Sequence, residues 1–159
     1  MNTEQKVNAI MRYIVAETRE EKNLAISEIK NIMEYPAETE KNKNIEEMID
    51  SIFMEIGMPC HLIGYNYTVY AIKIAIENPD IINNITFVLY PTVASKYDTT
   101  SSRVERGISR AIESAWNRAD IDVIEKYFGN TISMAKGKPT NSEFIARMAN
   151  IVKLGIANG

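Results

Sequence analysis

Apolar residues recur at intervals of three and four along most of the chain, which is the spacing of amphipathic helices. Residues 5–16 have this spacing and predict a first short helix. Thr18 followed by Glu21 has the pattern of a capping box, so a second helix is expected to start there. These two helices are expected to form a short N-terminal helical hairpin.

A polar stretch separates this hairpin from the rest of the chain. Pro36 is expected to end the second helix, because proline lacks the backbone N–H that a helix interior needs. Residues 36–44, PAETEKNKN, are polar and are expected to form a linker. The pattern thus predicts a helical extension with its linker at residues 1–43 and a separate domain at residues 44–159.

The pattern beyond the linker is also helical. The segment 84–97 contains Pro91, which either opens a new helix at its first position or kinks a longer one. Thr140 and Glu143 form a second capping-box pattern. No segment alternates convincingly as a strand, so the expected fold class is all-α. The helices expected after the linker cover residues 45–56, 65–77, 84–97, 101–117, 121–128 and 140–154.

Residues 91–117 combine a short helix, a tight turn at residues 98–100 and a longer helix, which is the arrangement of a helix-turn-helix. On the longer helix, Arg103, Arg106 and Arg110 fall on one side. A DNA-recognition helix needs such a division, because its outer face must enter the major groove. The opposite side, which is expected to be buried, consists of Val104, Ile108, Ala111, Ile112 and Ala115.

Spacing alone leaves two interpretations of this arginine face open. It is either an ordinary solvated surface or a surface that reads DNA. In the second interpretation the arginines can bond guanine, and Glu105 can accept a hydrogen bond from the cytosine amino group, with Ser109 beside them. Ser101 or Ser102 at the helix N-terminus could hold a phosphate, helped by the free backbone N–H groups there.

The distribution of charge favours the second interpretation more than the net charge of −3 does. Residues 1–58 hold 7 Lys/Arg against 12 Asp/Glu, a net charge of −5. Residues 59–159 hold 11 against 9, a net charge of +2. The C-terminal part can therefore face a polyanion, and Lys136 and Lys138 in it are expected to contact a DNA backbone.

Composition argues against several other classes of protein. No apolar run reaches the roughly 18 residues of a membrane span, so no membrane association is expected. The single cysteine excludes an internal disulfide, and one cysteine with one histidine cannot build a zinc site. No group of residues has the spacing of a catalytic site. We therefore expect a cytoplasmic protein that is not an enzyme and that uses neither a metal nor a cofactor.

Three stretches, HLIGYNYTVYAI, VLYPTVASKYDTTSSRVERGISRAIESAW and KGKPTNSEFIARMA, closely resemble the C-terminal effector domain of the master response regulator of sporulation in endospore-forming bacteria. The resemblance runs from about residue 45 to about residue 155. It implies a six-helix DNA-binding domain that binds short promoter boxes and activates or represses transcription. The resemblance implies that the glutamate and arginine of the family's RVER motif contact bases, and these two residues match Glu105 and Arg106. The family's serine and arginine that precede them match Ser102 and Arg103.

The sequence departs from this family in two places. Family members typically carry arginine and then histidine where this chain has Ser109 and Arg110, which puts the preferred box in doubt. The well-known members also carry a phosphoacceptor receiver domain of alternating strands and helices ahead of the effector. Residues 1–43 are too short and too helical for such a domain, and no aspartate precedes Asp50. We therefore expect no control by phosphorylation within this chain.

Together these observations predict a sequence-specific transcriptional regulator that binds double-stranded DNA as a homodimer. The alternative is a protein-interaction module that modulates a full-length regulator or RNA polymerase without reading DNA. Region 119–132 corresponds to the family's surface near the polymerase sigma subunit, which would then be a partner. The residues expected to read bases are Arg103, Glu105, Arg106, Ser109 and Arg110, and those expected to contact the backbone are Ser101, Ser102, Lys136 and Lys138.

Overall fold

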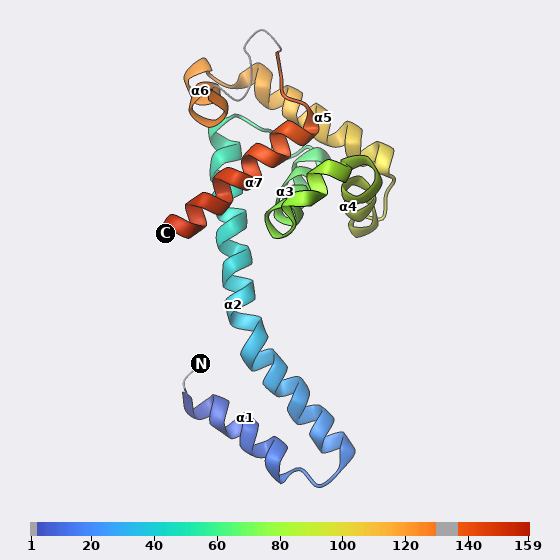
Figure 1. Cartoon of the computed structure of the whole chain (residues 1–159), viewed down its shortest axis with the longest axis vertical. Helices are drawn as coiled ribbons and strands as arrows, with labels where there is room; N and C mark the ends of the chain where they lie inside the picture. The colour runs from blue at the N-terminus through green and yellow to red at the C-terminus, as the bar shows by residue number, and fades with distance from the viewer. Residues whose placement is uncertain (1–2, 130–136) are drawn as a thin grey trace. The chain divides into compact units, whose positions relative to one another are not determined.

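The computed structural model of the chain describes residues 3–129 and 137–159. All regular structure in these residues is helical, which confirms the predicted all-α class (Figure 1). The longer helices are α1 (Thr3–Val15), α2 (Arg19–Glu55), α3 (Ile63–Glu77), α4 (Tyr90–Lys96), α5 (Ser101–Arg118), α6 (Ile121–Phe128) and α7 (Asn141–Asn158). A 3-10 helix, η1 (Pro79–Asn84), and a π-helix, η2 (Ile85–Leu89), lie between α3 and α4.

The expected end of the second helix at Pro36 is wrong. Helix α2 continues through Pro36, and residues 36–44, which were expected to be a linker, are helical. The segment after the proline, residues 37–47, holds four glutamates, two lysines and one alanine, which are strong helix formers. A proline removes one hydrogen bond and can bend a helix without ending it. Local propensity therefore outweighs the proline here.

The chain forms two compact units, residues 1–44 and residues 45–159. In the first unit, the predicted capping box at the start of α2 is present. The Glu21 N–H donates to the Thr18 hydroxyl at 3.2 Å, and the Thr18 N–H donates to the Glu21 carboxylate at 3.1 Å. Helix α1 is joined to α2 by an ion pair between Arg12 and Glu28 at 2.7 Å.

The apolar side chains of α1 find little cover in this unit. Among the side chains described in residues 4–29 and 40–44, only Ala9 and Ala25 are buried. Small residues at this contact let the two helices approach each other, while the larger apolar residues of α1 remain on the surface. These exposed residues, which we call the α1 stripe, are Val7, Ile10, Met11, Ile14 and Val15.

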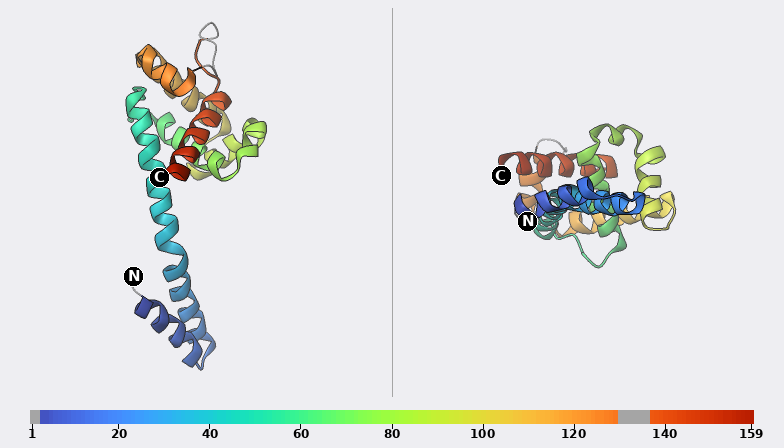
Figure 2. Two further views of the ribbon diagram at one scale, coloured as in Figure 1. Left: turned by 60° about the vertical axis from the view of Figure 1, so that its left-hand side comes forward. Right: turned by 90° about the horizontal axis from the view of Figure 1, so that it is seen from below.

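The second unit is built around α3, which packs against both α5 and α7, while α4 packs against α5 (Figures 1 and 2). Aromatic rings fill the centre of this core. The ring of Phe144 lies 6.0 Å from that of Phe53 and 5.5 Å from that of Phe128, measured between centroids. Trp116 is partly buried, and its ring centroid lies 5.3 Å from that of Phe128.

Two glycines set the close crossing of α3 and α5. A Cβ atom added at Gly64 would overlap the backbone carbonyl group of Gly107, and one added at Gly107 would lie 3.0 Å from the Tyr67 ring. No side chain can fit between the helices at this point, so their backbones come into direct contact. This contact seats α5 against the core and leaves its opposite face exposed.

Helices α4 and α5 form the predicted helix-turn-helix. Pro91 is the second residue of α4. The π-helix η2 runs directly into α4, and Leu89 at the junction has helical dihedral angles, so Pro91 lies near a change of helix type within a continuous helical segment. The turn between the helices contains Asp98, whose φ of 49° is in the left-handed region. Aspartate tolerates this conformation better than most residues. The Thr99 N–H donates to the Ala94 carbonyl at 2.9 Å and closes the turn.

Candidate nucleic-acid interface

Helix α5 presents the division into two faces that its sequence predicts. The five residues of the expected apolar side are all buried. On the other side Arg103, Glu105, Arg106 and Arg110 are exposed, whereas Ser109 is half-buried. The structure thus brings the five residues expected to read bases onto the outer part of one helix.

The N-terminus of α5 is capped by Thr100, a residue whose capping role the sequence pattern did not indicate. Its hydroxyl oxygen accepts a hydrogen bond from the Arg103 N–H at 3.3 Å. Ser101 and Ser102 are consequently the first two residues of the helix, where backbone N–H groups have no partner within the helix. Both serines lie at the end of α5 that attracts anions.

An open hollow of about 640 Å³ lies beside α5. Four of the residues expected to contact DNA line it from α5, and Lys138 lines it from the segment before α7. We call it the α5–α7 hollow. Arg103 and Arg110 lie on the exposed face of α5 outside this lining. The residues that α5 contributes to the hollow are Ser102, Glu105, Arg106 and Ser109.

The start of α7 forms the opposite wall of this hollow, which the sequence reasoning missed. Thr140, Asn141 and Ser142 line it there, and Thr86 and Tyr90 line it from η2 and α4. The capping box at Thr140, present as predicted, is the local signal that fixes where α7 begins. The approach of α7 to α5 is a tertiary contact, and no local sequence pattern could reveal it.

The two lysines expected to contact the DNA backbone have different outcomes. Lys136 lies outside the described residues. Lys138 is exposed, and its ammonium group lies 3.8 Å from the Glu113 carboxylate of α5. An exposed pair at this distance contributes little stability and leaves the lysine able to turn toward another anion.

Asn141 joins three helices at the base of the hollow. Its side-chain amide donates to the Tyr90 hydroxyl at 2.9 Å and to the backbone carbonyl of Glu105 at 3.1 Å. Burial is the main reason why the pKa of Tyr90 is raised; the Asn141 hydrogen bond lowers it, and the negative charge of Glu105 raises it. Tyr90 therefore stays a neutral hydroxyl at physiological pH.

Helix α5 is one of two positively charged segments of the second unit, the other being residues 126–159, which hold 5 Lys/Arg against 1 Asp/Glu, a net charge of +4. Residues 45–159 hold 11 Lys/Arg against 13 Asp/Glu, a net charge of −2. Helix α5 alone holds four arginines against two glutamates, a net charge of +2. A polyanion would thus be attracted to these two segments more than to the unit as a whole.

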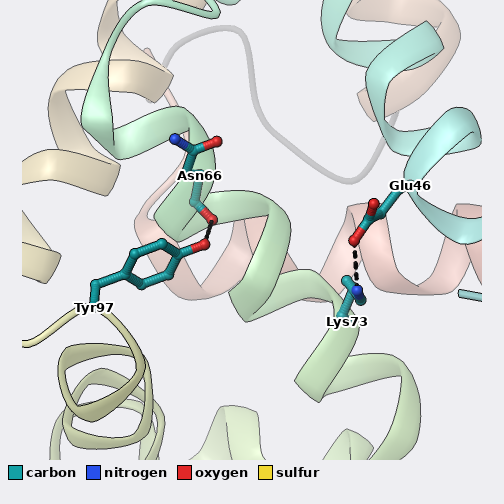
Figure 3. Close-up of polar contacts among 4 residues, drawn as sticks. All are labelled: Glu46, Asn66, Lys73 and Tyr97. Atoms are coloured by element: carbon teal, nitrogen blue, oxygen red, sulfur yellow. Dashed lines mark hydrogen bonds and ion pairs between the residues drawn. The ribbon is translucent and has the colours of Figure 1, made fainter. Parts of the chain in front are cut away.

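A second group of polar contacts holds α2, α3 and α4 together away from the hollow (Figure 3). The Tyr97 hydroxyl at the end of α4 donates to the Asn66 carbonyl of α3 at 3.2 Å. Lys73 of α3 pairs with Glu46 of α2 at 2.6 Å. The first contact ties the end of α4 to α3, and the second ties α3 to α2, so we assign both a structural role.

Other kinds of site have little support in residues 3–129 and 137–159. They contain no group of three or more histidine, cysteine, aspartate or glutamate residues that could hold a metal ion. Cys60 and His61 are both exposed. None of the helices in these residues is long and apolar enough to cross a membrane.

Residues 49–152 match the protein family described as "Sporulation initiation factor Spo0A C terminal". The match covers more than half of the chain and includes the helix-turn-helix, both walls of the α5–α7 hollow and the core that supports them. It confirms the resemblance seen in the sequence. The family consists of DNA-binding effector domains that regulate transcription in sporulation and is not a family of enzymes. The chain belongs to the Spo0A C-terminal family of DNA-binding effector domains.

Proposed function

We propose that this protein is a sequence-specific transcriptional regulator that inserts α5 into the DNA major groove. The observation that carries the proposal is the exposed arginine-rich face of α5, set on a rigid helical core that buries the opposite face. An α-helix fits the major groove, where each base pair presents a distinct pattern of donors and acceptors. The protein would act in the cytoplasm on promoter DNA.

Five residues of α5 are proposed to read base edges. Arg103, Arg106 and Arg110 can each donate two hydrogen bonds to guanine, and Glu105 can accept one from cytosine. Ser109 is half-buried in the hollow, so only a base that projects toward it would come within reach of its short side chain. The exposed face of α5 holds an anionic side chain as well as cationic ones, which argues for selective binding to bases. A surface that bound only phosphates would need cationic side chains alone.

A second set of residues is proposed to hold the phosphate backbone and fix the register of α5. Ser101 and Ser102 would do so at the N-terminus of α5, where the backbone N–H groups favour an anion. Lys138 would exchange its weak pairing with Glu113 for a phosphate, and Lys136 is proposed to act beside it. These contacts would raise affinity for any duplex without selecting a sequence.

Selection of bound duplexes from a random pool tests the proposal most directly. The expected result is a short recurring box, together with an affinity for that box which falls steeply as salt is raised. Weak binding with no recurring box would reduce the protein to a non-specific DNA binder. The absence of any salt-dependent binding would contradict a DNA-reading role and favour a role in contacting another protein.

That alternative function, contact with another protein, has one observation in its favour. Ile121 at the start of α6 is 64% exposed, and Asp122 and Glu125 beside it are exposed as well. This apolar and acidic surface lies in the region that the family resemblance places near the polymerase sigma subunit. Contact through α6 is compatible with DNA reading through α5, so both can operate in one regulator.

Residues 1–44 are proposed to be an extension that pairs two copies of the protein, and residues 45–159 to be the effector part. Support comes from the α1 stripe, in which Ile14 and Val15 are 65% and 67% exposed. Residues 1–44 hold 7 Lys/Arg against 8 Asp/Glu, so two copies would repel each other little and neither would be drawn to DNA. Pairing would let one dimer occupy two neighbouring boxes.

A further inference from the structure

Asn141 occupies a position from which one side chain touches all three helices around the α5–α7 hollow. It is the first residue of α7, directly after the capping residue Thr140. Its two bonded partners are the hydroxyl of Tyr90 in α4 and the carbonyl of Glu105 in α5. Glu105 in turn is a proposed base reader whose carboxylate-bearing side chain is exposed.

The chemistry of these bonds leaves one possible orientation for the amide. A backbone carbonyl can only accept a hydrogen bond, so the atom of Asn141 that faces Glu105 must be its Nδ2. That NH₂ group has two protons, one for the Glu105 carbonyl and one for the Tyr90 hydroxyl. Tyr90 is itself 4% exposed and therefore cannot shift easily to follow a displaced partner.

The bond to Glu105 falls on the part of α5 that must be placed most accurately. A carbonyl oxygen has two lone pairs, so the Glu105 carbonyl can accept from Asn141 while remaining in the helix ladder. The backbone of Glu105 is thus held from inside while its side chain faces outward. Small displacements of a reading helix matter, because a bidentate contact with a base tolerates little error in position.

We infer that Asn141 is a positioning residue for base selection, which sets how α5 presents Glu105 and Arg106 to the DNA. This inference rests on the proposed function. Asn141 acts through the backbone of Glu105 and through Tyr90, so it controls discrimination among sequences more than affinity for duplex DNA in general. Its role differs from that of Lys138, which would affect all sequences alike.

The test compares Asn141→Ala with wild type for binding to the selected box, to the same box with single base changes, and to a scrambled duplex at one salt concentration. Asn141→Ala is expected to reduce discrimination by about tenfold, the size expected for loss of one or two hydrogen bonds. The loss should be concentrated at the positions that Glu105 and Arg106 read, with scrambled-duplex affinity unchanged. Asn150→Ala, an exposed asparagine on α7, is the matched control.

Two further variants separate positioning from a general loss of structure. Asn141→Asp keeps the size of the side chain and gains from its charge in the first turn of α7, but it replaces both donors by oxygens that repel the Glu105 carbonyl, so it should lose discrimination as alanine does. Its charge is matched by Asn150→Asp. In a Glu105→Ala background, Asn141→Ala should cause no further loss of discrimination at the position read by residue 105.

Three outcomes would overturn the inference. The first is full discrimination in Asn141→Ala, and the second is an equal loss of affinity for the box and the scrambled duplex. The third is an undiminished effect of Asn141→Ala at that position in the Glu105→Ala background. In each case Asn141 would only stabilise the fold. The proposed function would still hold as long as the wild-type protein selects a box. A wild-type protein that selects no box would overturn both.

Discussion

At the scale of single residues, Arg106 lies on the exposed face of α5 and lines the α5–α7 hollow. We expect Arg106→Ala to cost about 1–3 kcal/mol in binding to the preferred box and to relax selectivity at one position. Folding should not change, because the side chain is exposed. Titration against a panel of single-base variants of the box measures both effects.

Arg118 provides a control for this variant, since it is an exposed arginine in the last turn of the same helix and lies outside the lining of the hollow. Arg118→Ala should leave selectivity unchanged. If Arg106→Ala instead weakens binding to every sequence by the same factor, Arg106 holds a phosphate and does not read a base.

By the resemblance seen in the sequence, Ser109 and Arg110 stand where family members typically carry arginine and then histidine, so we propose that they retune the preferred box. Ser109 lines the hollow, which gives space for a longer side chain at that position. The double variant Ser109→Arg with Arg110→His is expected to shift the selected box toward the one that the family usually prefers. A repeat of the random-pool selection with this variant is the measurement.

The same double variant can also give a negative answer. An unchanged selected box, with affinity retained, would mean that residues 109 and 110 lie near the DNA without reading it. The single variant Arg110→His shows how much of any change in the selected box comes from residue 110 alone. Of the two residues, Arg110 is exposed and Ser109 is half-buried.

At the scale of helices, the crossing of α3 and α5 determines where the reading helix lies. Gly64→Ala is expected to lower the free energy of unfolding by about 2–3 kcal/mol, because the new methyl group would meet the backbone of Gly107, which cannot move aside. Urea denaturation measures the loss. Without this clash, replacing a helical glycine by alanine would raise stability by up to about 1 kcal/mol.

Gly155→Ala is the matched control for this substitution. At that position in α7 the added methyl group would meet only the end of the Met48 side chain, which is flexible and can rotate away. We expect a change in unfolding free energy within about 1 kcal/mol. Equal stability of Gly64→Ala and wild type would contradict direct contact between the α3 and α5 backbones.

Most helices could be predicted from the sequence, because capping boxes, apolar spacing and turn residues are local signals. The start of α7 at Thr140 and the two faces of α5 are examples. The error at Pro36 has a local cause as well, since the helix formers after the proline outweigh its effect. The crossing at Gly64 and Gly107 could not be predicted, because the sequence does not show which atoms of another helix lie against each glycine.

At the scale of the whole molecule, the candidate site was only half predictable. The outer face of α5 follows from the periodicity of one helix, so the sequence alone places Arg103, Glu105 and Arg106 on it. The second wall of the hollow comes from a segment far along the chain. Asn141 contacts Glu105 across 36 positions, a contact that depends on how α7 packs on the core. Positioning residues of this kind become visible only in three dimensions.

Pairing through the α1 stripe is the prediction that concerns the whole protein. Ile10→Glu with Ile14→Glu places two charges on an apolar surface that α2 leaves exposed. We expect this variant to sediment as a monomer, to bind a single box as wild type does, and to lose about tenfold or more in affinity for two boxes in tandem. The reason is that pairing makes the second binding event intramolecular and so raises its effective concentration.

Leu154→Glu is the control, because Leu154 is an exposed apolar residue of α7, 54% exposed and outside the extension. It should leave both sedimentation and tandem binding unchanged. Deletion of residues 1–43 should also give a soluble monomer. This monomer should still bind one box, more weakly than the intact chain does, and should show no cooperativity on tandem boxes. If the double variant remains a dimer, or binds tandem boxes as well as the intact protein does, the α1 stripe does not pair protomers.

The exposed stripe would then be a docking surface for a different protein. Capture of that protein would be lost in Ile10→Glu with Ile14→Glu but kept in Leu154→Glu.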